Sequence, residues 1–488
     1  MNLVALLVEP PEGATGGEPV IYAGALVVTR DELTARVHAI RDALRGLGVE
    51  QGTPVAVMLD NNPGAIATLF AVWAAGGVHV PLNPRLTDDE VGRLLGAVPP
   101  VAAVTSGEHM TRFTALGIPV LVLADDAYRV ERVAPRDDPA AHYDVDVALV
   151  QLTSGTTGTA KPVLLTHSGV LALMDGVIGK LRGGKSTTAS STPNLVPVSL
   201  SAWAGIYNVL FAFRVGAPIV LMEHFEPREM ARLVAQHHIT STVLPPAAIA
   251  MCSDDEEITS LAPLKFVRSI SAPLSPFQAR RFHDRFGVGV LNSYGQTEIG
   301  GEVIGWTAAD WREWGATKLG AVGRPHEGVE VRTTDGELQL RTPALSAGYA
   351  DRSGGFDDRV TDDGWFRTGD LGWVDDDGFV WLEGRASDQI NRGGMKVLPA
   401  EVEEVLRAAP GVHDAAVIGE PDDRLGEVPI AFVVTDDDAA AAADALEAHC
   451  RAHLSPWKIP VRFVRIDALP RNEAGKVVKH QLIAGGTA

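Results

Sequence analysis

The stretch Leu152-Thr-Ser-Gly-Thr-Thr-Gly-Thr-Ala-Lys-Pro162 consists mainly of small residues and carries a lysine near its end. It follows an apolar run, residues 146–152, that is typical of a buried strand. Small residues let a backbone bend sharply and approach a ligand closely, and successive N–H and hydroxyl groups form a concave anion site. A flexible linker is the alternative, but linkers seldom follow directly on a buried strand. The stretch therefore predicts a phosphate-binding loop.

The order of residues distinguishes between two kinds of phosphate loop. The P-loop of ordinary nucleoside triphosphatases needs a glycine directly before its lysine and a Ser or Thr directly after it. Ala160 and Pro162 occupy those places here, which disfavours that class. The order Thr-Ser-Gly-Thr-Thr-Gly-x-x-Lys instead resembles the phosphate loop of the adenylate-forming superfamily, which includes acyl-CoA synthetases, amino-acid adenylation domains and luciferases.

Composition narrows the class of protein and its surroundings. The chain has 488 residues, more than one domain usually holds, and a net charge of -20, which argues against a nucleic-acid partner. Cys252 and Cys450 lie far apart and form no disulfide framework, so we expect a reducing, cytoplasmic location. No signal peptide is expected at the start. Residues 195–213 carry no charged side chain and have the length of a membrane span, but a buried helix beside a ligand pocket is the preferred interpretation.

The hydrophobic pattern predicts two domains. Helical and strand patterns alternate through most of the chain, beginning with a capped helix at residues 29–48 and strands at 55–59 and 78–82. Such alternation is typical of an α/β fold with largely parallel sheets covered by helices. Tight hairpins follow Gly323, one of them with Asp335-Gly336 at its turn. The chain ends with a short helix at 399–408, strands at 412–418 and 428–434, and a helix at 437–453. We therefore expect a large N-terminal domain, 1–385, that includes a small β subdomain, and a small, mobile α+β domain, 386–488.

Four further motifs follow the phosphate loop in the order found in the adenylate-forming superfamily. They are Asn292-Ser-Tyr-Gly-Gln-Thr-Glu298, Trp365-Phe-Arg-Thr-Gly-Asp-Leu-Gly372, Gly384-Arg385 with Asn391-Arg-Gly-Gly-Met-Lys396, and Pro470-Arg-Asn-Glu-Ala-Gly-Lys476. Each alone is weak, because a Tyr or Glu at a strand end is usually surface and a lysine near a C-terminus is usually solvated. Together they resemble that superfamily over about residues 150–480.

The resemblance implies a role for each motif. Tyr294 would stack on adenine, Asp370 and Arg385 would bind the ribose, and Lys476, Thr297 and Glu298 would be catalytic. Glu298 and Thr157 would hold Mg²⁺. The residues expected to bind the nucleotide are Thr153, Ser154, Gly155, Thr156, Thr157, Gly158, Lys161, Ser271, Ala272, Pro273, Asn292, Ser293, Tyr294, Gly295, Asp370 and Arg385. Gly393 and Gly394 would let the pantetheine arm of CoA pass, and Ser387 would be the hinge of the small domain.

The resemblance also implies two half-reactions. A carboxylic acid reacts with ATP to give acyl-AMP and pyrophosphate, and the thiol of CoA then displaces AMP. Between the two steps the resemblance implies that the small domain rotates, which removes Lys476 and opens a tunnel for the thiol. The acyl pocket would include Val196, Trp203 and Tyr207. Related enzymes that activate amino acids place an Asp in this region, but residues 190–221 contain no Asp or Glu. A hydrophobic acid other than an amino acid is therefore the expected substrate.

Several departures from the family pattern keep other functions open. Ala160-Lys161-Pro162 replaces the usual Pro-Lys-Gly, and Ser271 replaces the first glycine of Gly-Ala-Pro. Pro162 lacks a backbone donor and stiffens the loop. One alternative is therefore an enzyme that mainly converts ready-made acyl-AMP and CoA to a thioester. A second is a non-catalytic nucleotide-binding protein, which the retained Lys476 argues against. A metal site built from His449, Cys450 and His453 is not supported, because no partner pair lies nearby.

Overall fold

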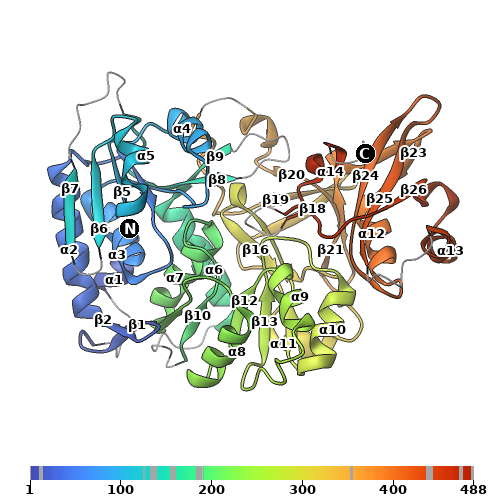
Figure 1. Ribbon diagram of the computed structural model, residues 1–488, viewed down its shortest axis with the longest axis horizontal. Coiled ribbons are helices and arrows are strands. Elements are labelled where there is room, and N and C mark those ends of the chain that lie inside the picture. Colours follow the sequence, from blue (N-terminus) through green and yellow to red (C-terminus); the bar gives the residue numbers. More distant parts are fainter. Residues whose placement is uncertain are drawn as a thin grey trace.

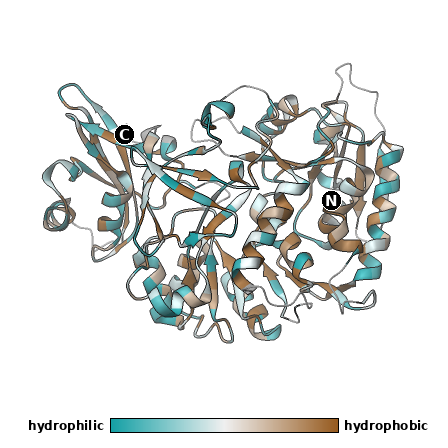
Figure 2. Cartoon of the chain, turned by 180° about the vertical axis from the view of Figure 1, so that it is seen from behind, coloured by the Kyte–Doolittle hydropathy of each residue, from teal (hydrophilic) through white to brown (hydrophobic). Residues whose placement is uncertain are grey.

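The computed structural model describes residues 2–9, 15–124, 127–131, 140–153, 161–182, 190, 192–351, 355–435, 443–471 and 476–484. Figure 1 shows a large body, drawn in blue to yellow, and a smaller C-terminal unit in orange and red at its side. In Figure 2 the strands and central helices are mostly hydrophobic, whereas the helices at the outer edges carry hydrophilic residues. This distribution is expected where helices cover both faces of buried sheets.

The first sheet of the body carries the predicted phosphate loop at one end. Its strands lie in the order β7-β6-β5-β3-β4-β8-β9. The five central strands are parallel: β3 (Pro54–Met58), β4 (Val78–Pro81), β5 (Ala102–Ser106), β6 (Val120–Ala124) and β8 (Val147–Thr153). The edge strands β7 (Ala127–Glu131) and β9 (Lys161–Thr166) are antiparallel to their neighbours. The sheet is therefore parallel-rich, as predicted.

The second sheet has the order β14-β13-β12-β10-β11-β1-β2. Its members are β1 (Pro19–Ala23), β2 (Leu26–Thr29), β10 (Asn194–Val196), β11 (Ile219–Leu221), β12 (Ser241–Leu244), β13 (Phe266–Ser269) and β14 (Gly289–Leu291). All its pairs are parallel except β1 with β2. Helices α3 (Pro63–Ala75) and α7 (Trp203–Val215) contribute to one core with residues of both sheets.

Local sequence signals explain where several helices begin. Helix α2 (Arg30–Gly46) begins at Thr29, whose side chain accepts from the amide of Glu32 while the Glu32 carboxylate accepts from Thr29, which is the predicted capping box. The remaining helices of the body are α1 (Ala5–Val8), α4 (Asp88–Ala97), α5 (Met110–Thr114), α6 (His167–Arg182), α8 (Pro227–Gln236), α9 (Pro246–Asp254), α10 (Pro276–Phe286) and α11 (Ala308–Trp314).

The interpretation of residues 195–213 as one buried helix is wrong. Residues 195 and 196 are the last two residues of strand β10, residues 197–202 connect the two elements, and α7 begins at Trp203. A buried parallel strand and a buried helix both lack charged residues, so composition alone does not separate them. In the described part of the chain, no helix combines the length and the apolar character that a membrane crossing requires.

Two antiparallel sheets precede the C-terminal unit along the chain. One contains β15 (Ser293–Gln296), β16 (Gly301–Gly305) and β17 (Arg324–Pro325), and the other β18 (Glu330–Thr334), β19 (Glu337–Arg341), β20 (Phe366–Val374) and β21 (Val380–Arg385). The β18–β19 hairpin turns at Asp335 and Gly336, with φ of 51° and 82°. Two consecutive positive φ angles are typical of the type I′ turn that the Asp-Gly pair predicts.

The C-terminal unit has its own sheet and core. Its strands are β22 (Ile390–Arg392), β23 (Met395–Val397), β24 (Val412–Asp422), β25 (Gly426–Thr435) and β26 (Arg462–Arg465), and its helices are α12 (Pro399–Arg407), α13 (Ala443–His453) and α14 (Lys479–Ala484). The predicted helix at 437–453 is described only from Ala443. A separate hydrophobic cluster includes Val402, Leu406, Val417 and Val433. This arrangement supports a domain junction after β21, although the exact boundary stays a prediction.

Candidate active site

The described ends of the phosphate loop lie on neighbouring antiparallel strands. Thr153 at the end of β8 is paired with Lys161 at the start of β9, and its hydroxyl donates to the Lys161 carbonyl oxygen at 3.2 Å. Ser154, Gly155, Thr156, Thr157 and Gly158 lie outside the described residues. A P-loop joins a strand to a helix, whereas this loop joins two strands of one hairpin. The structure therefore agrees with the rejection of the P-loop class.

Tyr294 and Asp370 meet in the interior, although 76 residues separate them in sequence. The Tyr294 hydroxyl donates to Asp370 Oδ2 at 2.6 Å, and Arg385 Nε lies 2.7 Å from Asp370 Oδ1. Burial and the neighbouring Asp370 carboxylate hold the pKa of Tyr294 well above its usual value, so the phenol remains a donor. Asp370 and Arg385 are opposite each other in the β20–β21 pair. The sheet thus brings together three of the predicted nucleotide-binding residues.

Glu298 is held by two residues that the sequence motifs did not identify. The Tyr349 hydroxyl donates to Glu298 Oε1 at 3.1 Å, and an Arg359 guanidinium nitrogen lies 3.3 Å from the same oxygen. The Lys161 ammonium lies 4.9 Å from the centre of the Tyr349 ring. Tyr349 therefore links the lysine of the phosphate loop with the carboxylate of the second motif.

Gln296 was also missed, although it lies inside a motif. Its amide nitrogen donates to Asp370 Oδ2 at 2.7 Å and to the Thr368 carbonyl oxygen at 2.9 Å. Its position in the sequence between Tyr294 and Glu298 could have identified it as a site residue. Tyr349 and Arg359 carry no such signal, because folding alone brings them to the site.

Lys476 reaches this site from the C-terminal unit. Desolvation by the surrounding protein lowers the pKa of its ammonium, and repulsion from Arg385 lowers it further, while attraction to Asp370 and Glu298 opposes the shift. The predicted catalytic lysine is therefore close enough to interact electrostatically with residues of three other motifs.

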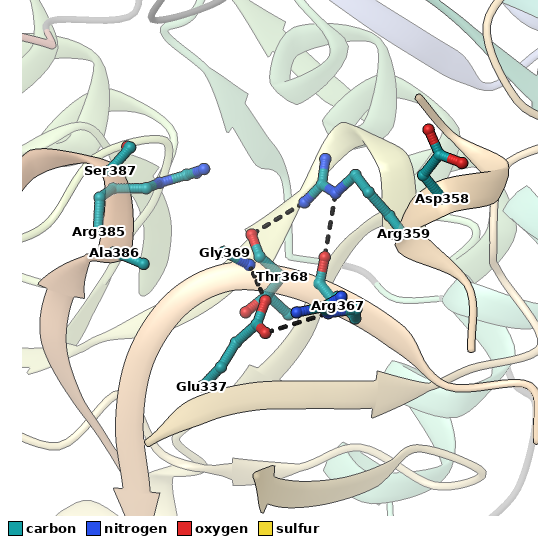
Figure 3. Close-up of a pocket in the computed structure, with 9 residues that line it drawn as sticks. All are labelled: Glu337, Asp358, Arg359, Arg367, Thr368, Gly369, Arg385, Ala386 and Ser387. Carbon is teal, nitrogen blue, oxygen red and sulfur yellow. Dashed lines mark hydrogen bonds and ion pairs between the residues drawn. The ribbon is translucent and has the colours of Figure 1, made fainter. Parts of the chain in front are cut away.

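A cleft of about 350 Å³ opens beside these residues. Figure 3 shows Arg385, Ala386 and Ser387 on one side, Arg359 with Asp358 on the other, and Thr368-Gly369 between them. Because Arg385 also pairs with Asp370, the cleft is continuous with the predicted ribose site. It lies where the body meets the C-terminal unit.

Comparison with known proteins identifies the family of this chain. The model for AMP-binding enzymes matches residues 13–350, and the model for the C-terminal domain of AMP-binding enzymes matches residues 401–476. The chain belongs to the AMP-binding enzyme family. The predicted membership of the adenylate-forming superfamily, in its acyl-CoA synthetase branch, is confirmed.

Individual relatives are similar over nearly their whole length. The sulfoacetate–CoA ligase of Cupriavidus necator is 31% identical over 462 residues, which cover 90% of this chain and 89% of that protein. The feruloyl-CoA synthase of an Amycolatopsis species is 32% identical over 481 residues, 94% of each chain. The crystal structure of ATP-bound MatB from Rhodopseudomonas palustris has a TM-score of 0.88 at 26% identity and covers 99% of this chain and 98% of its own.

In this AMP-binding enzyme the predicted adenine wall contains a strained residue. Ser271 has a φ of 70°, in the left-handed region that favours glycine. Ala272 and Pro273 follow it, and Asn292 and Ser293 lie beyond the neighbouring strand β14, where the Ser293 hydroxyl donates to the Ser269 carbonyl oxygen at 2.7 Å. Gly295 allows its backbone to pack closely against Gly301, since an added Cβ would lie 1.8 Å from the Gly301 carbonyl oxygen. Contact within the protein is therefore enough to require a glycine at this position.

The three predicted acyl-pocket residues lie in two neighbouring elements, Val196 in β10 and Trp203 and Tyr207 in α7. Val196 and Trp203 are buried, and the Trp203 indole donates to the Gly300 carbonyl oxygen at 2.7 Å. The Tyr207 ring lies 5.8 Å from the Trp203 ring, and its hydroxyl has no hydrogen-bond partner among the residues that the structure describes. An ion pair of Arg268 and Glu302, 2.6 Å apart and with side chains 15% and 12% exposed, lies in the same region. The surroundings are therefore not purely apolar.

The remaining predicted residues lie in turns of the C-terminal unit. Gly393 and Gly394, with φ of 59° and 85°, form the turn between β22 and β23, so the hairpin itself requires them. Ser387 lies in a single 3₁₀ turn, Ala386–Asp388, directly after β21. These placements leave the proposed contact with CoA and the hinge role open to experiment.

Proposed function

We propose that this protein is an AMP-forming acyl-CoA ligase that activates a carboxylic acid other than an amino acid. In the first step a carboxylate oxygen attacks the α-phosphorus of ATP, and the bond to pyrophosphate breaks. In the second, the thiol of CoA attacks the acyl carbonyl, and AMP leaves as the thiol loses its proton. The observation that carries the proposal is the Asp370 carboxylate, held by Tyr294 and Arg385 within a chain that belongs to the AMP-binding enzyme family.

The chain's residues meet the main difficulty of the first step, which is to bring two anions together. The Lys476 ammonium would lie between the carboxylate and the α-phosphate and stabilise the negative charge that develops there. Tyr294, Gln296 and Arg385 fix the Asp370 carboxylate by contacts of 2.6 to 2.7 Å. Of the roughly four acceptor sites of a carboxylate, these contacts leave one, which can accept a ribose hydroxyl in a defined orientation.

The described residues also fit a magnesium–nucleotide substrate. Among the described residues, no group of three or more His, Cys, Asp or Glu side chains could hold a metal without help. Magnesium usually binds through one or two carboxylates together with substrate phosphates, which fits Glu298 beside the phosphate loop. Mg²⁺ held by Glu298 and Thr157 would neutralise charge on the phosphates when bound.

The acid substrate is a separate question. Of the two named relatives, one acts on sulfoacetate and the other on ferulate, which differ in size and charge. We infer that the acid binds beside Trp203 and Tyr207, and its hydrophobic character stays a prediction. A screen of acids for AMP release with ATP and CoA would identify it.

Exchange of labelled pyrophosphate into ATP, with and without an acid, tests the proposal. The enzyme should show acid-dependent exchange, and Lys476→Ala should reduce that exchange by at least about a hundredfold. The same variant should convert synthetic acyl-AMP and CoA to thioester at nearly the wild-type rate. Equal loss of both half-reactions would show that the role of Lys476 is wrong.

Two other results of this test would overturn the assignment. Thioester formation from acyl-AMP without exchange would identify an enzyme that uses only supplied adenylates. Binding of AMP with neither reaction would identify a non-catalytic protein.

A further inference from the structure

Arg359 lies outside every motif but contacts residues from two of them. It is the last residue of a 3₁₀ turn, Asp357–Arg359, and its guanidinium carbon lies 4.3 Å from the centre of the Phe366 ring. One terminal nitrogen donates to Glu298 Oε1 at 3.3 Å, and the other donates to Gln296 Oε1 at 3.1 Å and the Thr368 carbonyl oxygen at 2.9 Å. The side chain therefore connects the Glu298 motif with the Asp370 motif.

All the hydrogen-bonding capacity of this guanidinium is used within the protein. Its Nε donates to the Arg367 carbonyl oxygen at 3.0 Å, and its first terminal nitrogen also reaches the Tyr349 hydroxyl at 3.5 Å. An arginine has five N–H donors, and these contacts account for all of them. Arg359 is thus arranged to hold other residues and has no donor left for a phosphate.

Glu298 receives its two contacts on one side. Both Arg359 and Tyr349 donate to Oε1, and no hydrogen bond to Oε2 is found among the described residues. The exposed fractions of the Arg359 and Glu298 side chains are 23% and 14%, so water screens this pair less than an ordinary surface pair. One carboxylate oxygen is fixed, and the other can accept a cation.

We propose that Arg359 is a positioning residue that orients Glu298 toward the metal ion of the magnesium–nucleotide substrate. The inference rests on the proposed function, since it assigns Glu298 to that metal ion. Lysine could not replace it fully, because one ammonium cannot reach acceptors on Glu298, Gln296 and Thr368 in the planar fork that arginine provides. The competing role is purely structural, in which Arg359 only fastens β20 to the neighbouring sheet.

Calorimetry with an α,β-methylene ATP analogue, with and without Mg²⁺, separates the two roles. Arg359→Met should bind the magnesium-free analogue within about twofold of wild type, but the gain in affinity from Mg²⁺ should fall by about tenfold. The gain in affinity that Mg²⁺ gives Arg359→Lys should lie between the gains of the wild type and of Arg359→Met. Arg332→Met is the matched control, because Arg332 also pairs with a carboxylate, Asp363, and lies over a ring, Trp365, at 4.5 Å.

Kinetics provide a second readout. Arg359→Met should raise the Mg²⁺ concentration needed for half-maximal pyrophosphate exchange and leave thioester formation from synthetic acyl-AMP within about twofold. In a Glu298→Gln background the same substitution should have little further effect, because the residue that it orients is already changed. If Arg359→Met folds poorly, Arg359→Lys with the Glu298→Gln cycle still provides the test.

Two results would overturn the inference. One is that Mg²⁺ raises the affinity of Arg359→Met for the analogue as much as it raises that of the wild type. The other is that Arg359→Met loses magnesium-free binding and both half-reactions to the same extent, as a structural role predicts. Failure of the proposed function would look different, because the wild-type enzyme would then show no exchange at all.

Discussion

At the scale of single residues, Ser271 stores strain that the family's usual glycine avoids. Its φ of 70° places Cβ against the backbone, a conformation that costs an L-residue about 1–2 kcal/mol. Ser271→Gly should therefore raise the free energy of unfolding by about 1 kcal/mol, measured by urea denaturation. Ser241→Gly is the control: Ser241 lies in β12 without a positive φ, so glycine there should destabilise. A destabilised Ser271→Gly protein would mean that the serine side chain offsets its strain through a contact.

The residues of the candidate site differ in how far the sequence could predict them. Tyr294, Asp370 and Arg385 occur in motifs of fixed order, and the structure brings them together. Tyr349 and Arg359 lie 51 and 61 residues from Glu298, and only the packing of the sheets makes them its partners. Ser271 was recognised as a departure, but its positive φ could not be, since backbone angles depend on the strands around it.

At the scale of elements, helix α12 of the C-terminal unit docks against helix α10 of the body. Glu404 Oε1 accepts from the Phe277 amide, in the first turn of α10, at 3.4 Å. The first amides of a helix have no partner within it and attract an acceptor. Glu404→Ala should weaken docking by about 1 kcal/mol, so that pyrophosphate exchange falls about fivefold relative to thioester formation. An unchanged ratio of the two rates would show that this contact does not stabilise the adenylating arrangement.

The ionisation of Glu404 gives this contact a pH dependence. Burial raises the pKa of Glu404, while Arg407, the Phe277 amide and the Ser275 hydroxyl partly oppose the shift. Glu404 lies where α12 contacts α10, so we expect docking to supply this burial and to strengthen as pH falls through the raised pKa. Glu404→Gln keeps the acceptor without the charge. The ratio of exchange to thioester formation should therefore depend less on pH in this variant than in the wild type.

Element types were more predictable than their lengths. The capping box located α2, and the Asp335-Gly336 turn located the β18–β19 hairpin, because both signals are local. Strands β24 and β25 extend beyond the predicted runs as an antiparallel pair, since ladder hydrogen bonds stabilise residues whose own pattern is weak. Residues 195–213 were misread because burial removes the polar pattern that separates a strand from a helix.

At the scale of the whole molecule, the order of strands could not be predicted. Strand β1 lies beside β11, almost two hundred residues later, and β8 lies between its sequence neighbour β9 and the distant β4. Periodicity identifies an α/β fold but carries no information about which strands pair. The existence of a separate C-terminal unit was easier to predict, because it followed from the order of the motifs and from the change of hydrophobic pattern near Arg385.

The proposed rotation of the C-terminal unit can be tested at the segment that joins it to the body. Arg385 is extended, with φ of -84° and ψ of 135°, and a 3₁₀ turn begins at Ala386. Proline fits the first position of such a turn after an extended residue, so Ala386→Pro should stabilise the observed arrangement and resist rotation. Pyrophosphate exchange should stay within about twofold of wild type, while thioester formation from acyl-AMP should fall at least about tenfold. Lys476→Ala should give the opposite pattern, and Ser387→Ala should affect neither step. If Ala386→Pro forms thioester at the wild-type rate, the second half-reaction does not require rotation about this segment.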